Sequence, residues 1–90
     1  MKKRVAIIGV TGSVGQEFVQ SLDNHPWFEV TQIAASERSA GKMYLDAIRD
    51  ASGIIAWDVG GQIPEYIKSM KVLKVDEINV QELDLIFSAV

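Results

Sequence analysis

The sequence predicts an α/β fold with a doubly wound parallel sheet, and three observations carry this prediction. A short apolar run over residues 5–9 is rich in β-branched residues, which is typical of a strand buried on both faces. Glycines stand at positions 9, 12 and 15, immediately before residues with helical spacing; residues 9–15 are called the glycine turn below. A second apolar stretch over 28–35 completes a strand–helix–strand unit. The pattern indicates the first part of a Rossmann-like domain.

The helix between these strands is predicted from apolar residues spaced i, i+4, i+5 and i+8. These residues are Val14, Phe18, Val19 and Leu22. Asn24 and Pro26 end the helix, because proline cannot continue it and disfavours helical geometry at the preceding residue.

The middle of the chain predicts short elements. A helical face is indicated by the spacing of Tyr44, Ile48 and Ala51. The apolar run 54–57 predicts a strand, and the glycine pair at 60–61 breaks it. Residues 64–70 predict a short helix with Pro64 in its first turn.

The last part of the chain predicts two further strands, 72–75 and 85–90, the second of them buried. Between them, Asn79 and Glu82 fit a capping box at the start of a helix. An open sheet continues after a strand with a loop and a covering helix. The apolar run 85–90 therefore predicts that residues 1–90 are the amino-terminal part of a larger domain.

Composition and charge exclude several classes of protein. Hydrophobic residues make up 48% of the chain, which excludes disorder. The absence of cysteine excludes a disulfide scaffold, a thiolate metal site and a cysteine nucleophile within these residues. The net charge of −3 argues against a nucleic-acid partner. The apolar run after the basic residues 2–4 is too short for a secretory signal or a membrane span, so we expect a soluble, cytoplasmic protein.

The glycine turn has the residue types that a dinucleotide pyrophosphate requires. Gly9 lets the chain leave the strand sharply, Gly12 lets phosphate approach the backbone, and Gly15 lets the helix pack closely. Thr11 and Ser13 add hydroxyl donors, and the helix N-terminus adds unpaired N–H groups with partial positive charge. The first gap is two residues rather than one, which departs from the usual fingerprint. The alternative is a turn that merely connects the strand and the helix.

The end of the second strand bears on the choice between NADP and NAD. NAD-specific domains carry an acidic residue about 20 positions after the glycines, where it binds the ribose 2′-OH. Here Ser36 takes that place and Arg38 follows, and both groups suit a 2′-phosphate. Glu37 favours NAD if its side chain turns inward, and a solvated loop is the third alternative. We predict NADP.

Four segments together resemble the aspartate-semialdehyde dehydrogenase family, most closely its branch from archaea, fungi and some bacteria. They are GVTGSVGQ at 9–16, NHPWFEV at 24–30, AASERSAGK at 34–42 and IFSA at 86–89. The resemblance implies a Rossmann-like NADP domain and a second domain, outside these residues, for catalysis and dimerisation. It also implies NADPH-dependent reductive dephosphorylation of β-aspartyl phosphate to aspartate semialdehyde, on the route to lysine, threonine and methionine. In this family a cysteine forms a thioester and a histidine acts as acid and base.

The resemblance implies cofactor contacts at three places. They are Thr11, Gly12, Ser13 and Val14 for the pyrophosphate, Ser36, Arg38 and Ser39 for the 2′-phosphate, and Ser88 and Ala89 beside the cofactor. No catalytic or metal-binding residue is expected, because the chain lacks cysteine and its one histidine, His25, precedes a proline in a turn. We therefore expect these residues alone to be inactive. The resemblance also implies a full-length homo-oligomer that binds NADP(H), and neither nucleic acid nor a membrane is expected as a partner.

Two alternatives stay open. A related acyl reductase, such as malonyl-CoA reductase, resembles this family in the same region, and residues outside this chain would read its substrate. The other alternative is a non-catalytic nucleotide-binding module, against which the apolar run 85–90 argues.

Overall fold

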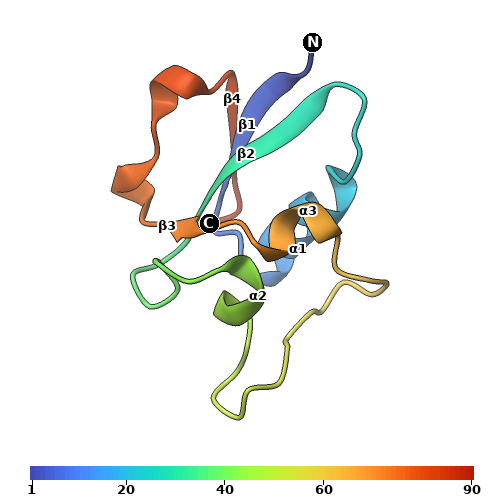
Figure 1. Cartoon of the computed structure of the whole chain (residues 1–90), viewed down its shortest axis with the longest axis vertical. Helices are drawn as coiled ribbons and strands as arrows, with labels where there is room; N and C mark the ends of the chain where they lie inside the picture. The colour runs from blue at the N-terminus through green and yellow to red at the C-terminus, as the bar shows by residue number, and fades with distance from the viewer.

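A four-stranded parallel sheet forms the centre of the computed structural model, which describes residues 1–90 (Figure 1). The strands stand in the order β3-β2-β1-β4, which confirms the predicted α/β, Rossmann-like fold class. They are β1 (Lys3–Ile8), β2 (Phe28–Ala34), β3 (Val72–Leu73) and β4 (Leu85–Ser88). The helical elements are α1 (Ser13–Ser21), α2 (Tyr44–Ala47), α3 (Glu65–Lys68) and the 3-10 turns η1 (Val75–Glu77) and η2 (Val80–Glu82). None of the helices is long and apolar enough to cross a membrane.

β1 lies inside the sheet because its side chains are apolar on both faces. Val5, Ala6 and Ile7 are completely buried. Ile7 pairs with Ile33 of β2 on one side and with Phe87 of β4 on the other. The predicted strand buried on both faces is confirmed, although it begins at Lys3 and ends at Ile8.

Helices cover one side of the sheet and an irregular connection covers the other (Figure 1). On the helical side, Phe18 of α1 stacks on Phe87 with ring centroids 5.2 Å apart. The Tyr66 hydroxyl of α3 donates a 2.8 Å hydrogen bond to the carbonyl of Val19, which joins the two helices. On the other side, two hydrogen bonds between the Gln32 side chain and the Asn79 backbone hold the connection from β3 to β4.

The start of α1 differs from its predicted pattern. Val14 was predicted on the buried face but is 57% exposed, because Gly15 and Gln16 occupy the inner side of the first turn. The end of the helix is as predicted: α1 stops before Pro26, and Asn24 adopts a left-handed conformation with a φ of 54°.

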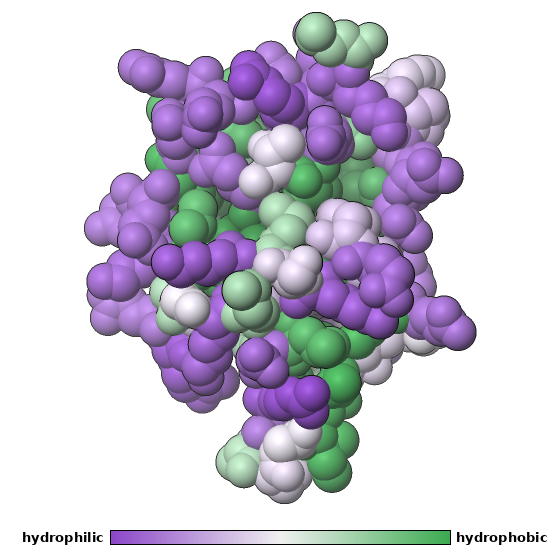
Figure 2. Space-filling view, viewed as in Figure 1, coloured by the Kyte–Doolittle hydropathy of each residue, from purple (hydrophilic) through white to green (hydrophobic).

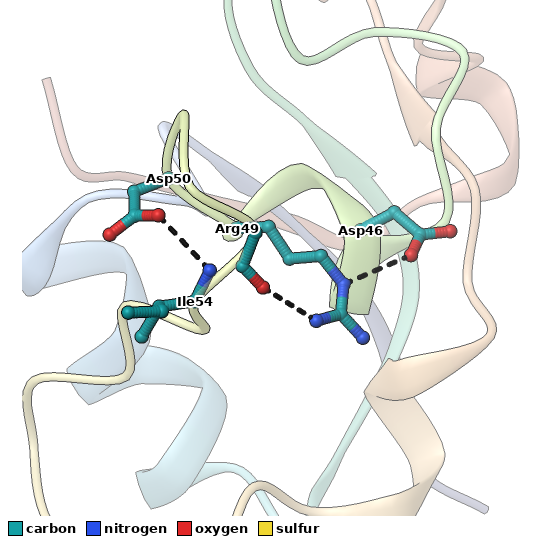
Figure 3. A network of polar contacts seen from close by, with 5 residues as sticks. Asp46, Arg49, Asp50 and Ile54 are labelled. Atoms are coloured by element: carbon teal, nitrogen blue, oxygen red, sulfur yellow. Dashed lines mark hydrogen bonds and ion pairs between the residues drawn. The ribbon is translucent and has the colours of Figure 1, made fainter.

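The strand predicted over 54–57 is wrong: Ile55 makes only an isolated antiparallel bridge to Arg49, and the rest of the segment is a loop in which Ile54 is 66% exposed. The Asp50 carboxylate accepts a 3.0 Å hydrogen bond from the Ile54 N–H, while Arg49 pairs with Asp46 at 3.4 Å (Figure 3). Such local side-chain bonds to the backbone compete with strand pairing. Apolar surface is visible along this loop, at the bottom of the view (Figure 2).

Three other predicted elements are shorter than expected. The helix with Tyr44, Ile48 and Ala51 on one face ends at Ala47, so Ala51 lies outside it and is exposed. The helix predicted over 64–70 begins only after Pro64, which occupies the capping position instead of the first turn. The strand predicted over 72–75 pairs with β2 over two residues.

The predicted capping box is only partly formed. The Asn79 side chain accepts a 3.1 Å hydrogen bond from the Gln81 N–H, but it caps the 3-10 turn η2 and not an α-helix. Glu82 accepts from the Asn79 side chain at 3.1 Å and not from its backbone.

β4 corrects a further expectation. The run 85–90 was predicted to be buried, but Leu85 and Ile86 are each 43% exposed. The physical reason is position, because β4 is the edge strand beside β1 and has no neighbour on its outer side. Only Phe87 is covered within the strand, by the rings of Phe18 and Phe28.

Candidate dinucleotide-binding site

The carboxyl ends of three strands meet around the glycine turn. The Gly9 N–H donates to the Ala34 carbonyl at the end of β2, at 2.9 Å. The Ala89 N–H, just after β4, donates to the Ile8 carbonyl at 2.8 Å. The chain leaves β1 towards β2 on one side and returns as β4 on the other, so the crevice above β1 is a topological switch point. Ligands of open α/β sheets bind at such points.

Two glycines are required by the local geometry. Gly9 has a φ of 77°, and a Cβ there would lie 3.3 Å from the backbone of Ala89. A Cβ on Gly15 would lie 2.7 Å from the backbone of Val10, so a side chain would force α1 away from the turn. At Gly9 and Gly15, the end of β1, the start of α1 and the end of β4 are therefore packed together without room for a side chain.

Gly12 differs from these two glycines. Its φ of −78° is accessible to any residue, and a Cβ there would find its nearest atom 4.0 Å away, at the Gly9 carbonyl oxygen. Nothing inside the chain demands a glycine at this exposed position. The missing side chain leaves open space directly before α1, where a ligand can approach the backbone.

Unpaired backbone donors surround this space. The N–H groups of all five residues 11–15 donate no hydrogen bond within the chain. The first backbone bond of α1 runs from the Gln16 N–H to the Gly12 carbonyl, at 2.9 Å. No side chain caps the helix and no acidic residue lies in its first turn. Unpaired N–H groups at a helix N-terminus attract an anion, and phosphate is the anion that such turns bind.

The loop after β2 forms the second part of the candidate site. Ser36 and Arg38 are exposed, and Arg38 forms no ion pair within the chain. Ser39 is only 7% exposed, because residues 36–40 fold into a turn in which the Ser36 carbonyl accepts from the Ser39 N–H at 3.0 Å. Of the three residues predicted for a 2′-phosphate, the structure thus presents two at the surface and buries the third.

A shallow hollow beside this loop adds a residue that the sequence did not single out. Ser36 and Glu37 line it on one side, and Lys74 and Asp76 line it on the other. Lys74 is the one cation in this lining, and its place after β3 brings it beside the end of β2. Nothing specific in the sequence indicated Lys74, because a lysine at the end of a predicted strand is common.

A match to a family model decides the family. Residues 4–90 match the model described as semialdehyde dehydrogenase, NAD binding domain. The chain belongs to this family. The match includes the glycine turn, the loop after β2 and β4, so the semialdehyde dehydrogenase domain is recognised over nearly the whole chain.

Curated relatives of this semialdehyde dehydrogenase domain are aspartate-semialdehyde dehydrogenases of archaea and fungi, which confirms the resemblance. The enzyme of Methanothermobacter thermautotrophicus is 42% identical over 94% of this chain and 22% of its own length. That of Saccharomyces cerevisiae is 39% identical over 97% of this chain and 22% of its own length. The chain spans less than a quarter of the length of these relatives.

A solved structure agrees with this assignment. The aspartate-semialdehyde dehydrogenase of Candida albicans, crystallised with NADP, superposes on the whole chain with a TM-score of 0.84 and 37% identity. The superposition covers 24% of that protein. The semialdehyde dehydrogenase domain therefore has the same fold as the matching part of that enzyme.

Two buried residues hydrogen-bond to the glycine turn, and the sequence did not connect either of them with it. The hydroxyl of Tyr44 donates to the Val10 carbonyl, and the side-chain amide of Gln16 donates to the Thr11 carbonyl. Burial raises the pKa of Tyr44 well above its usual range, with a smaller contribution from Tyr66, so its hydroxyl remains a donor. The sequence offered one indication: Gln16 is a polar residue one helical turn before the buried Val19, so it lies on the buried face of the same helix.

The largest hollow of the semialdehyde dehydrogenase domain lies elsewhere. It has a volume of about 680 Å³, and its lining includes Leu22, His25, Glu29 and Tyr66, at the opposite end of α1. None of the predicted site residues lines it. His25 is a turn residue, whose Nδ1 accepts a 3.0 Å hydrogen bond from the Trp27 N–H. No group of three or more potential ligands for a metal ion is present in the chain.

Proposed function

We propose that this chain is the NADP-binding part of an aspartate-semialdehyde dehydrogenase. The observation that carries the proposal is the glycine turn, where the five N–H groups of residues 11–15 remain unpaired beside the open space at Gly12. The family assignment and the likeness to an enzyme crystallised with NADP support it.

The pyrophosphate would lie at the start of α1. The N–H groups of Thr11, Ser13 and Val14 would donate to its oxygens, and the helix dipole would favour its negative charge. The hydroxyls of Thr11 and Ser13 would add donors. Gly12 contributes by leaving the space that the phosphates occupy.

The adenosine 2′-phosphate would lie at the loop after β2. Ser36 and the unpaired Arg38 would contact it, and a charge-assisted bond from a guanidinium is stronger than a neutral one. Ser39 is buried, so it would support the loop and would contact the phosphate less than Ser36 and Arg38. Lys74 adds a positive charge on the far side of the hollow.

In the full-length enzyme, bound NADPH supplies the hydride that reduces an acyl group. Ser88 and Ala89 lie beside the end of β1, where the Ala89 N–H donates to the Ile8 carbonyl. They would therefore lie next to the cofactor in the crevice above β1. The resemblance places the thioester-forming cysteine and the acid–base histidine outside these residues. For the whole protein, the proposal includes β-aspartyl phosphate as the substrate. It also includes a homo-oligomeric assembly and a cytoplasmic location.

Titration of this chain with NADPH and NADH tests the cofactor assignment. We expect NADPH to bind, and NADH to bind more weakly, because only NADPH carries the phosphate that Arg38 would contact. A folded chain that binds neither nucleotide would overturn the proposed function. A coupled assay with acyl phosphate is expected to show no turnover by these residues alone, and measurable turnover would contradict the thioester assignment.

A further inference from the structure

Two buried side chains hold the glycine turn from inside the protein. The Tyr44 hydroxyl donates a 3.1 Å hydrogen bond to the Val10 carbonyl. The Gln16 amide nitrogen Nε2 donates a 3.0 Å hydrogen bond to the Thr11 carbonyl. Tyr44 is completely buried and Gln16 is 1% exposed, so neither side chain lies on the surface where a cofactor would sit.

These bonds orient two consecutive peptide groups. A trans peptide is planar, and its C=O and N–H point in opposite directions. Because the Val10 carbonyl points at the buried Tyr44, the N–H of Thr11, in the same peptide group, points away from the core. The Thr11 carbonyl is likewise drawn to Gln16 and away from the open space at Gly12. A carbonyl oxygen that faced this space would repel a phosphate.

We propose that Tyr44 and Gln16 are positioning residues of the pyrophosphate site, which set the orientation of the glycine turn without touching the cofactor. This inference rests on the proposed function, because it assigns a role to the turn in binding NADPH. It adds that the affinity for the pyrophosphate depends on two hydrogen bonds inside the protein.

Gln16 also connects the turn to a distant segment. Its Nε2 donates to the Ala56 carbonyl at 2.9 Å, and its Oε1 accepts from the Asp58 N–H at 2.7 Å. One buried amide therefore makes three hydrogen bonds and joins the glycine turn to residues 56–58. Removal of this amide would leave the Thr11 carbonyl free to rotate towards the surface.

The chain offers a matched control for each residue. The Tyr66 hydroxyl donates to the Val19 carbonyl at 2.8 Å, within the body of α1. The Gln20 amide donates to the Gly60 carbonyl at 2.9 Å, one helical turn after Gln16. Both controls make the same kind of bond to a backbone carbonyl, and neither contacts the glycine turn.

The test compares Tyr44→Phe with Tyr66→Phe, and Gln16→Met with Gln20→Met, in the full chain. Each variant is titrated with NADPH and with 2′-AMP, which carries the 2′-phosphate but no pyrophosphate. Loss of one orienting hydrogen bond is expected to weaken NADPH binding about 3- to 10-fold in Tyr44→Phe and Gln16→Met. Binding of 2′-AMP by these variants is expected to stay within about 2-fold of wild type, because 2′-AMP has no pyrophosphate to contact the turn. Binding of NADPH by the controls is expected to stay within about 2-fold as well, because the control substitutions leave the turn intact.

Three results would overturn the inference. Unchanged NADPH binding in Tyr44→Phe would do so, and so would equal losses in the Tyr66→Phe control or equal losses for 2′-AMP, since both indicate general destabilisation. If Gln16→Met does not fold by circular dichroism, Tyr44→Phe decides alone. A wild-type chain that binds neither nucleotide would instead overturn the proposed function, and the inference with it.

Discussion

The two ends of α1 offer opposite environments to a ligand. At its N-terminal end, beside the glycine turn, backbone N–H groups are unpaired and the helix dipole is positive. At its C-terminal end lies the larger hollow, where the helix dipole is negative and the carboxylates of Asp23 and Glu29 line the wall with Lys2. The volume is at one end and the unpaired donors are at the other. Unpaired donors suit a phosphate-bearing ligand, which is why NADP is proposed at the N-terminal end and not in the larger hollow.

The largest expected effect comes from filling the space at Gly12. Gly12→Val is expected to abolish detectable NADPH binding while the fold is kept, because φ at this position suits valine and the side chain would occupy the space of the pyrophosphate. The measurement is nucleotide titration with circular dichroism as the check on folding. His25→Ala, at the other end of α1, is the control and should bind normally. If Gly12→Val keeps wild-type affinity, Gly12 is not part of the site.

Arg38 tests whether the N-terminal end of α1 shares its ligand with the loop after β2. Arg38→Ala is expected to weaken NADPH binding about 10-fold and to leave NADH binding nearly unchanged, because only NADPH carries the 2′-phosphate. The control is Lys42→Ala, which removes another exposed cation a few residues later. Equal losses for both cofactors would mean that Arg38 supports the loop and does not read the phosphate.

Asp58 brings a negative charge to the positive end of α1. Its Oδ2 lies 3.5 Å from the Ser13 hydroxyl. Asp58→Asn is expected to tighten NADPH binding about 2-fold at low salt, because it removes repulsion with the pyrophosphate. The gain should disappear at high salt, since ions screen exposed charges. Weaker binding would show instead that the Asp58 carboxylate organises the site.

The smallest effect is expected from Asp84, far from the glycine turn. The hydrogen bond from the Arg4 backbone N–H, at 2.8 Å, holds the pKa of Asp84 below its usual value of 3.8. The ionised Asp84 carboxylate therefore stabilises the folded state at pH values above about 3.8. This stabilisation is lost as the pH falls through the pKa that Asp84 has in the folded state. Asp84→Asn should therefore flatten the pH dependence of the melting temperature below pH 4, with no change in NADPH affinity at pH 7. A pH dependence identical to that of wild type would contradict this role.

The central features of the fold could be predicted from the sequence, because the residue patterns that encode them are compatible with few other structures. An apolar run such as residues 5–9 must be covered on both faces, and glycines between a strand and a helix favour a tight turn. The order β3-β2-β1-β4 agrees with the predicted fold class, although the order itself was not predicted. These features depend on local pattern, and local pattern is visible in one sequence.

The remaining features depend on contacts that a sequence does not display. The run 54–57 has the composition of a strand, but Asp50 bends the chain, and the run makes a single bridge to Arg49 instead of joining the sheet. Tyr44 looked like one residue of a helical face, and its bond to Val10, which lies 34 positions earlier, follows only from the fold. Ser39 shared the surface pattern of Ser36, and the turn over 36–40 buried it.

The most direct test of the account is the amide NMR spectrum of the ¹⁵N-labelled chain during titration with NADPH. We predict shifts of the amides of residues 11–15, together with residues 36–38, because these groups would contact the two phosphate-bearing parts of the cofactor. Residues 22–31, beside the larger hollow, should remain unchanged. Shifts centred on residues 22–31, with the glycine turn unaffected, would contradict the claim that the unpaired donors at the start of α1 form the cofactor site.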